Sequence, residues 1–581
     1  MTDKSVSFIR SLCAGQIEEE VIFPFPKMKE EERELVQGVI ASVDDLLGPK
    51  AEEFAKWDVA GEMPEEFIEE MKAFGLFGLI IPEEQGGMGF GNMAYSRTLQ
   101  QISHHDASVA VTVGAHSSIG MRGLKLFGTD EQKARYYEKL CTGEMIAAFC
   151  LTEAGAGSDA AAVKTTAEEK DDHYLLNGSK IWITNGGFAD FFTVFAKTGE
   201  KDGRSKLSAF IVTRDMEGVS TGPHEDKMGI RGSSTVTVYF EDVKVPKENL
   251  LGEKGDGFKV AMAILNSGRS GLGGGAVGGM KMLIKKSATY AMERKQFGEP
   301  IGTFGSIKEK IANMVVDCYA TEAAVTIVAH LSDEEYEDYS VEAAITKVFA
   351  SEALWRAADE ALQIAGGTGY MKEYPYERVL RDVRINRIFE GANEILHLFI
   401  ALTALNDVGQ GLKEMSKSLK GIFDHPIKGF GLLQEYARKR AGWATGIQAF
   451  DPPRMERVHE SLRAEAVLFE SLTRELATMA DRLLRKHGKK IIGKQFATRR
   501  MAKVMIDLFM LACTLSRVSQ AIEEKGAEKA APEVKIAKVF AGQVKRRCVQ
   551  AFNDIDRNTD ELMKELADFA YEHEGYIWDV I

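Results

Sequence analysis

A glutamate between an aromatic residue and a glycine is the strongest candidate for acid–base chemistry in this 581-residue chain. Glu390 lies in the run Arg387 to Ile395, after a basic segment and before the apolar run Leu396 to Ala401. If this region packs, the carboxylate is poorly solvated, which raises its pKa and makes it a better proton acceptor. A single glutamate is more often a solvated surface residue. The case for a general base therefore depends on other motifs.

A glycine-rich segment runs from Cys150 to Asp159. Glycines that alternate with small residues let the backbone approach a ligand closely, and the exposed N–H groups can bind an anion. A polar connecting loop has the same composition. These residues alone leave both interpretations open.

Two further glycine motifs have structural explanations. Gly273, Gly275 and Gly278 match G-x-G-x-x-G, but the run Phe258 to Leu265 before them predicts a helix, whereas a dinucleotide loop follows a strand. Small residues on a helix favour close packing instead. The run Gln363 to Tyr370 follows another predicted helix, where glycine commonly forms the C-cap.

Helical and β segments alternate along the chain and must position these motifs. Helical spacing with start signals predicts helices over 31–47, 65–74, 93–104 and 129–140. Short β-branched and aromatic runs predict strands over 191–196, 207–212 and 235–240, typical of a small barrel. Helical patterns return over 260–405, and irregular, glycine-rich sequence follows over 406–453. A final helical block covers 455–578.

Composition and charge exclude several classes of protein. The net charge of −14 argues against a nucleic-acid binder, which needs a basic face. We expect no metal site at His104, His105 and Asp106, because adjacent histidines do not share one face of a helix. The six cysteines lie far apart without a C-x-x-C pair and are interpreted as reduced thiols.

No secretory signal and no uninterrupted apolar stretch of ~18 to 20 residues is recognisable in the sequence. We therefore expect a cytoplasmic protein, with peripheral contact at the inner face of the membrane. A processed organellar form is the alternative, which Met1 disfavours.

Several motifs together resemble those of the acyl-CoA dehydrogenase family. Segments 150–162 and 363–382 are similar to its two signature patterns, and 181–186 and 293–298 also match. The resemblance covers 31–405 and extends into the C-terminal block; with 23–26 and 387–390, this is typical of the very-long-chain branch, which includes a relative used in complex I assembly. The implied fold is α+β and multidomain: an N-terminal extension (1–30), an N-terminal α-helical domain (31–146), a middle β domain (147–259), a four-helix-bundle domain (260–405), a basic and apolar connector (406–453) and an appended helical domain (454–581).

The resemblance implies FAD as cofactor, held between the domains and a neighbouring subunit. The positions that match its contacts are Phe149, Leu151, Thr152, Gly157, Ser158, Trp182, Ile183, Thr184, Arg294, Gln363, Ile364, Gly366, Gly367, Asn393 and Glu394. Arg294 and the turn 363–367 would reach FAD from the neighbouring subunit. Ala392 stands where the family usually has threonine, so a hydroxyl partner of the cofactor is lost.

The resemblance also implies the substrate contacts and the reaction. Ser158, Asn266, Arg269, Phe389, Glu390 and Gly391 match substrate-contact positions. Glu390 matches the base that removes the α-proton of an acyl-CoA while hydride leaves Cβ for the flavin, which gives a trans-2-enoyl thioester. The stretch 265–271, where some relatives carry the base, has no carboxylate.

Two features bear on location and substrate. The connector between Lys413 and Arg440 interleaves basic and large apolar residues, which predicts peripheral membrane contact through 412–443; a linker packed on the last domain is the alternative. Small residues at Gly114, Ala115, Gly120 and Gly123 predict either a deep acyl tunnel or close helix packing.

We expect an FAD-dependent long- or very-long-chain acyl-CoA dehydrogenase of fatty-acid β-oxidation. It would form a homodimer and pass electrons to an electron-transfer flavoprotein. An acyl-CoA oxidase is the enzymatic alternative. A protein of another class, an assembly factor or scaffold that retains the fold, is the second alternative.

Overall fold

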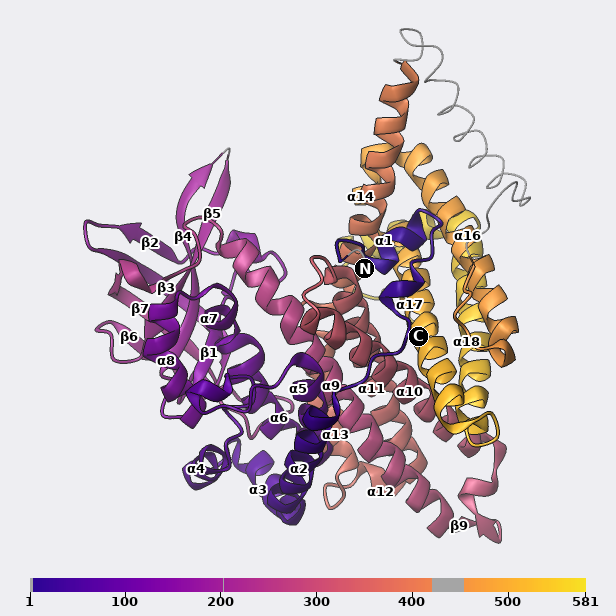
Figure 1. Ribbon diagram of the computed structural model, residues 1–581, viewed down its shortest axis with the longest axis horizontal. Coiled ribbons are helices and arrows are strands. Elements are labelled where there is room, and N and C mark those ends of the chain that lie inside the picture. Colours follow the sequence, from indigo (N-terminus) through magenta and orange to yellow (C-terminus); the bar gives the residue numbers. More distant parts are fainter. Residues whose placement is uncertain (1–3, 202, 421–453, 581) are drawn as a thin grey trace. The chain divides into compact units, whose positions relative to one another are not determined.

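The computed structural model describes residues 4–201, 203–420 and 454–580 (Figure 1). The chain divides into two compact units. Unit 1 comprises Met1–Ser5 and Pro24–Ile395, and unit 2 comprises Val6–Phe23 and Leu396–Ile581. The predicted membrane segment 412–443 lies, from residue 421 onward, outside the described residues.

The N-terminal part of unit 1 is helical. Four helices match the predicted ones to within two residues at each end: α2 (Glu30–Leu47), α4 (Glu65–Phe74), α5 (Asn92–His105) and α8 (Asp130–Thr142). Three shorter helices were not predicted: α3 (Ala51–Ala60), α6 (Ala107–Gly114) and α7 (Arg122–Phe127). Side-chain caps fix two of the starts. Asp106 accepts hydrogen bonds from the N–H groups of Ser108 and Val109, and Thr129 forms a capping box with Gln132.

A π-helical turn, η4 (Ala115–Gly120), follows α6 directly. Nδ1 of the fully buried His116 accepts a hydrogen bond of 3.0 Å from the N–H of Ala147, which fixes the turn to the first strand. Ser118 is fixed to α5 by a hydrogen bond of 2.7 Å with the hydroxyl of Tyr95. Such one-turn π-helices are frequent beside functional sites.

The β domain that the sequence predicts is confirmed. Its strands are β1 (Ala147–Cys150), β2 (Thr166–Glu169), β3 (His173–Thr184), β4 (Phe191–Lys201), β5 (Arg204–Thr213), β6 (Val219–Thr221), β7 (Thr235–Pro246) and β8 (Leu250–Leu251). The hydrogen-bonded order is β6-β7-β3-β2-β4-β5-β8, with β1 parallel to β4. No ladder among the described strands joins β6 to β8, so hydrogen bonding does not close the sheet into a complete barrel.

Alternate residues of β4 enter two different hydrophobic cores. Phe192 and Val194 pack into the core of the β domain itself. Phe191 and Phe195 face the opposite way, into the core that the N-terminal helices form. This follows from the two-residue period of a strand, which places successive side chains on opposite faces.

Three long helices follow in unit 1 and pack against one another: α9 (Gly257–Glu293), α10 (Gly305–Asp333) and α11 (Ser340–Ala365). A short hairpin, β9 (Lys295–Gln296) and β10 (Glu299–Pro300), separates the first two. The G-x-G-x-x-G residues lie within α9, as predicted. A Cβ at Gly278 would lie 1.9 Å from the carbonyl oxygen of Gln100, so this glycine lets α9 pack closely on α5.

Helix α10 is long and apolar enough to cross a membrane by length and composition alone. Most of its apolar stretch is buried inside unit 1, as is usual for a core helix. The chain then forms α12 (Gly367–Tyr370), α13 (Tyr376–Val383) and the 3₁₀ turn η8 (Arg384–Arg387), before α14 (Asn393–Lys420) begins.

Unit 2 contains α1 (Phe8–Cys13), most of α14, α16 (Arg463–His487), α17 (Gln495–Lys525), α18 (Ala531–Asp556) and α19 (Asp560–Glu572). The appended helical block is thus confirmed. Phe8 fills its core, with its ring centroid 6.4 Å from that of Phe469. The prediction of irregular structure from residue 406 is wrong for 406–420, because α14 continues through Lys420 despite Gly409 and Gly411.

All six cysteines of the chain lie among the described residues, are buried and form no disulfide. Burial raises the pKa of the Cys150 thiol to about 12. The Cys150 thiol is therefore protonated near neutral pH.

Candidate active site

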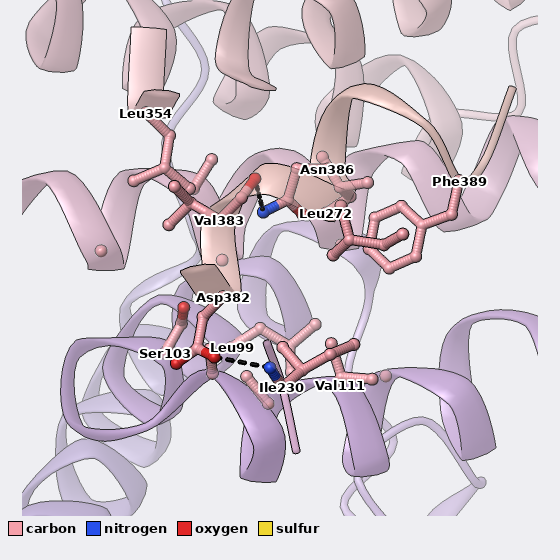
Figure 2. Close-up of a pocket in the computed structure, with 18 of the residues that line it drawn as sticks. Leu99, Ser103, Val111, Ile230, Leu272, Leu354, Asp382, Val383, Asn386 and Phe389 are labelled. Atoms are coloured by element: carbon pink, nitrogen blue, oxygen red, sulfur yellow. Dashed lines mark hydrogen bonds between the residues drawn. The ribbon is translucent and has the colours of Figure 1, made fainter. Parts of the chain in front are cut away.

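A cavity of about 150 Å³ lies inside unit 1, with Glu390 in its wall. One wall is a single face of α9, formed by Gly268, Gly271, Leu272, Gly275, Ala276, Gly279 and Met282. Helices α5 and α6 with η4 form a second wall, and α13 with η8 forms a third. Phe389 and Leu354 lie at opposite sides of the cavity in Figure 2. Most side chains in this lining are apolar.

Glu390 lies in the short loop between η8 and α14. Its φ of 56° and that of Gly391, 95°, place both residues in the left-handed region. For a residue other than glycine this conformation costs roughly 1–2 kcal/mol. Strain of this size at a carboxylate in a cavity wall is typical of a functional position.

The carboxylate of Glu390 lies against the backbone of α9. Its oxygen Oε2 is shielded from solvent and has no hydrogen-bond partner among the described residues. A Cβ at position 268 would lie 3.4 Å from this oxygen and 2.8 Å from Cγ2 of Ile119. A side chain at position 268 would therefore overlap Ile119 and contact the carboxylate.

Burial raises the pKa of Glu390 above its ordinary value of 4.5, while the charges of Arg269 and Lys347 lower it. Burial is the largest of these causes, so the net direction is upward. A carboxylate with a raised pKa is a stronger base near neutral pH. The unpartnered Oε2 is thus suited to accept a proton from a molecule in the cavity.

Arg269 and Asn266, predicted as substrate contacts, lie one turn apart on α9. Nη1 of Arg269 donates a hydrogen bond of 2.6 Å to Oδ1 of Asn266. The arginine is only 5% exposed, and its Nε has no partner among the described residues. Burial lowers the pKa of Arg269 to about 10, so it remains a cation at neutral pH beside Glu390.

Thr184, a predicted flavin contact, lies in the wall of the same cavity as Glu390. Next to it, the pairing of β3 with β7 shifts register between Lys180 and Ile183. Trp182 lies in this bulge with a φ of 57°, and its side chain is 63% exposed. Bulges commonly re-aim a side chain beside an active site. The exposed indole next to the cavity suits a flat aromatic ligand such as an isoalloxazine ring.

The glycine-rich segment forms a turn closed by a bridge between Glu153 and Ala156. Its base is rigid, because the carboxylate of Glu153 accepts hydrogen bonds from Lys180 Nζ (2.7 Å) and from the N–H groups of Lys164 (2.6 Å) and Thr165 (3.0 Å). Its tip, 154–158, is exposed apart from Ala156. The predicted contacts Gly157 and Ser158 are therefore accessible from solvent.

The other predicted flavin contacts fall into two groups. Leu151 and Ile183 are buried under the turn, while Phe149 and Thr152 are half-buried. Those assigned to a neighbouring subunit are not in the lining of the cavity: Arg294, Gln363, Gly366 and Gly367 are exposed, and Ile364 is buried. Glu394 is exposed, whereas the side chain of Asn393 is buried and bonded to Lys347.

The sequence reasoning missed Lys347 and the polar group formed by Asp106, Arg378 and Asp382 in the cavity wall. Oδ1 of Asp382 accepts a hydrogen bond of 2.5 Å from the N–H of Ile230 (Figure 2). Burial raises the pKa of Asp382 to about 7. The sequence shows Lys347 only as the one basic residue of the mainly apolar segment 341–350, and its bond to the loop of Glu390 has no local signal.

The small residues near the cavity divide into two pairs. Gly114 and Ala115 line it. Gly120 and Gly123 do not: a Cβ at Gly120 would lie 2.6 Å from the carbonyl oxygen of Ala115, and one at Gly123 would lie 2.8 Å from Leu251. Close packing is therefore the role of the second pair, and space in the cavity is the role of the first.

Models of four domain families match consecutive parts of the chain. They are "Acyl-CoA dehydrogenase, N-terminal domain" at 29–144, "middle domain" at 148–243, "C-terminal domain" at 255–405, and "ACAD9/ACADV, C-terminal domain" at 460–576.

Individual relatives match over most of their length. The very long-chain specific acyl-CoA dehydrogenase of human mitochondria is 43% identical over 533 residues, which cover 90% of this chain and 80% of that protein. A probable acyl-CoA dehydrogenase of Bacillus subtilis is 36% identical over 560 residues, 91% of this chain and 84% of that one. The crystal structure of an acyl-CoA dehydrogenase complexed with FAD from Bacillus anthracis superposes with a TM-score of 0.80 at 34% identity, over 97% of this chain and 94% of that chain. By its matched domains and these relatives, the chain belongs to the acyl-CoA dehydrogenase family.

Proposed function

We propose that this protein is an FAD-dependent dehydrogenase that converts long-chain or very-long-chain acyl-CoA to trans-2-enoyl-CoA. One observation carries the proposal: Oε2 of Glu390 has no hydrogen-bond partner among the described residues and lies in the wall of a largely apolar cavity that Thr184 of β3 also lines. Membership of the family supports it, as does the FAD bound to the relative from Bacillus anthracis.

The fit to FAD rests on the exposed indole of Trp182 and the exposed tip of the glycine-rich turn. Phe149, Leu151, Thr152, Gly157, Ser158, Ile183 and Thr184 would hold the cofactor with Trp182, and Arg294 with 363–367 would complete the site of a second subunit. When bound, FAD supplies the acceptor for the hydride that leaves Cβ of the substrate.

The residues of this chain position the substrate and move its proton. Oε2 of Glu390 takes the α-proton, and its raised pKa brings its basicity closer to that task. Backbone donors around Phe389, Glu390 and Gly391 would stabilise charge that develops on the thioester oxygen. The apolar walls exclude water, which strengthens both interactions.

The α9 wall supports a preference for long chains. From Gly268 to Met282 the helix rises ~21 Å, at about 1.5 Å per residue. An extended chain advances roughly 1.2 Å per bond, so the length of this wall corresponds to an acyl chain of about 18 carbons. Gly114 and Ala115 leave the opposite wall open.

The proposal extends to the remaining partners. Electrons would pass to an electron-transfer flavoprotein, and the second subunit would come from a homodimer. Peripheral contact of 412–443 with the inner face of the membrane, in a cytoplasmic protein, is proposed from the basic and apolar sequence of that segment.

Anaerobic bleaching of the flavin by acyl-CoA esters of increasing chain length tests the proposal. We expect bleaching by long chains only, and its loss in Glu390→Gln. The matched control Glu66→Gln changes an exposed carboxylate on α4, outside the cavity lining and the predicted flavin contacts, and should leave bleaching unchanged. A flavoprotein that no acyl-CoA bleaches would favour a scaffold, and rapid reoxidation of the reduced flavin by oxygen would favour an oxidase.

A further inference from the structure

The loop that carries Glu390 is anchored to α11 by a lysine. Lys347 is fully buried. Its Nζ donates hydrogen bonds of 2.7 Å to the carbonyl oxygen of Gly391 and 2.9 Å to Oδ1 of Asn393. Both acceptors are neutral, and the first belongs to the residue directly after the base. The ammonium group therefore holds the backbone beside Glu390.

The anchor continues through Asn393 to the other end of the loop. Nδ2 of Asn393 donates to Oε1 of Glu352 at 2.8 Å, and Nε of Arg387 donates to the same oxygen at 2.9 Å. Both ends of the loop are thus bonded to α11. The residues between them include Glu390 and Gly391 in left-handed conformations. A strained backbone of this kind persists only where its surroundings hold it.

Two cationic side chains influence the protonation of the Glu390 carboxylate. Arg269 of α9 and Lys347 of α11 act on Glu390, and both oppose the effect of burial on its pKa. Burial lowers the pKa of Lys347 to about 7; Glu390, Glu352 and Glu394 act against this, and Arg269 adds to it. Neither of these two hydrogen-bond acceptors is a carboxylate, so the charge of the lysine is balanced by the more distant carboxylates of Glu390, Glu352 and Glu394.

We infer that Lys347 is a positioning residue for proton abstraction: it fixes the Gly391 carbonyl so that the carboxylate of Glu390 stays over Gly268, and its charge favours the ionised form of that base. The inference rests on the proposed function. Lys347 does not line the cavity, so it acts through Glu390 without contact with the substrate.

The variant Lys347→Met tests both parts, because methionine keeps the approximate length of the side chain but donates no hydrogen bond. We expect kcat to fall by about 10²-fold with KM changed by less than about threefold, as for a misplaced catalytic group. We also expect the acid limb of the kcat/KM profile to move to higher pH, because a cation that favours the carboxylate is gone.

Two further variants separate the effect of Lys347 on the position of the loop from the effect of its charge on Glu390. Asn393→Ala weakens the anchor but keeps the lysine, so kcat should fall while the acid limb stays in place. Lys281→Met is the matched control: it removes a half-buried lysine that bonds Glu322 between α9 and α10, outside the cavity lining. Its kcat and pH profile should match those of the parent.

The outcomes distinguish this inference from the proposed function. A parent protein that no acyl-CoA bleaches contradicts the proposed function. A parent that is bleached, with Lys347→Met retaining its kcat within about twofold and its acid limb, overturns the inference alone. An equal loss in Lys281→Met also overturns it. If Lys347→Met does not fold as a flavoprotein, parent-like kcat in Asn393→Ala overturns the inference.

Discussion

Two fully buried lysines support the two sides of the candidate site in different ways. Lys180 bonds a carboxylate directly, since its Nζ lies 2.7 Å from Oε1 of Glu153 under the glycine-rich turn. In the part of the chain that the structure describes, Lys347 bonds two neutral acceptors beside the base, Gly391 O and Asn393 Oδ1. A charge in a direct ion pair mainly stabilises the fold, whereas a charge without a directly bonded counter-ion can favour ionisation of a carboxylate nearby. We therefore expect the two regions to respond differently to the same substitution.

Exchange of each lysine for methionine gives the largest expected difference. Lys180→Met leaves the buried carboxylate of Glu153 without its cation and should lower the free energy of unfolding by about 3 kcal/mol. Lys347→Met leaves only neutral acceptors unpaired and should cost about 1–2 kcal/mol. Denaturant unfolding of both variants measures these values. Equal losses of stability would mean that the two sites do not differ as described.

Addition of one methyl group in each region is the next test. Gly268→Ala places a Cβ 2.8 Å from Cγ2 of Ile119 and in van der Waals contact with Oε2 of Glu390, and the resulting shift of Ile119 in the cavity wall should lower kcat by about tenfold. Gly178→Ala places a Cβ 2.5 Å from Oγ1 of Thr165, which donates to Glu153, and should mainly lower stability, by about 1–3 kcal/mol. Steady-state kinetics and unfolding of both variants decide. A larger loss of kcat in Gly178→Ala than in Gly268→Ala would contradict the assignment of the catalytic effect to the region of Gly268.

The cavity wall away from both lysines should control chain length. Gly114→Leu adds a side chain where a Cβ meets no atom within 4 Å, so the protein should fold while long acyl chains lose room. We expect kcat/KM for a 16-carbon substrate to fall by about tenfold relative to an 8-carbon one. The control Gly123→Ala lies outside the cavity lining, and any loss there should be independent of chain length.

The smallest expected effect is a difference between the pH at which activity is lost and the pH at which the fold loses stability. The pKa of Glu390 is raised by burial, so activity, which needs the carboxylate, falls as the pH drops through a value above 4.5. Burial opposes ionisation of Glu153 too, but bonds from Lys180, Thr165 and Lys164 hold its pKa below 4.5 in the folded protein. Its contribution to stability is present above the unfolded pKa and is lost only as the pH falls through the lower, folded value. Activity should therefore disappear before stability during acid titration, which kinetics and circular dichroism at each pH measure.

Local patterns were enough to predict some of the helices and strands of unit 1. Helices α2, α4, α5 and α8 and strands β4, β5 and β7 each carry the periodicity that their burial requires, and all occur where the sequence places them. The continuation of α14 to Lys420 was not predictable in this way. Gly409 and Gly411 weaken a helix by propensity, and the sequence does not show what packing overrides this.

The site was predictable only in part. The position of Glu390 between Phe389 and Gly391 indicated poor solvation, which the structure confirms. The hydrogen bond from Lys347 to Gly391 joins residues 44 positions apart in the chain. The contact between Gly268 and Glu390 joins residues that are even farther apart. No local sequence pattern reveals either contact. For the same reason the four small residues from Gly114 to Gly123 looked equivalent, although only the first two line the cavity.

The two faces of β4 have a consequence for how unit 1 melts. Phe191 and Phe195 belong to the core of the N-terminal helices, while Phe192 and Val194 belong to that of the β domain. Neither core can come apart without exposing aromatic side chains of the shared strand. The two segments are therefore expected to lose structure in a single cooperative transition, and a chain cut between them at about residue 146 should yield two fragments that do not fold alone.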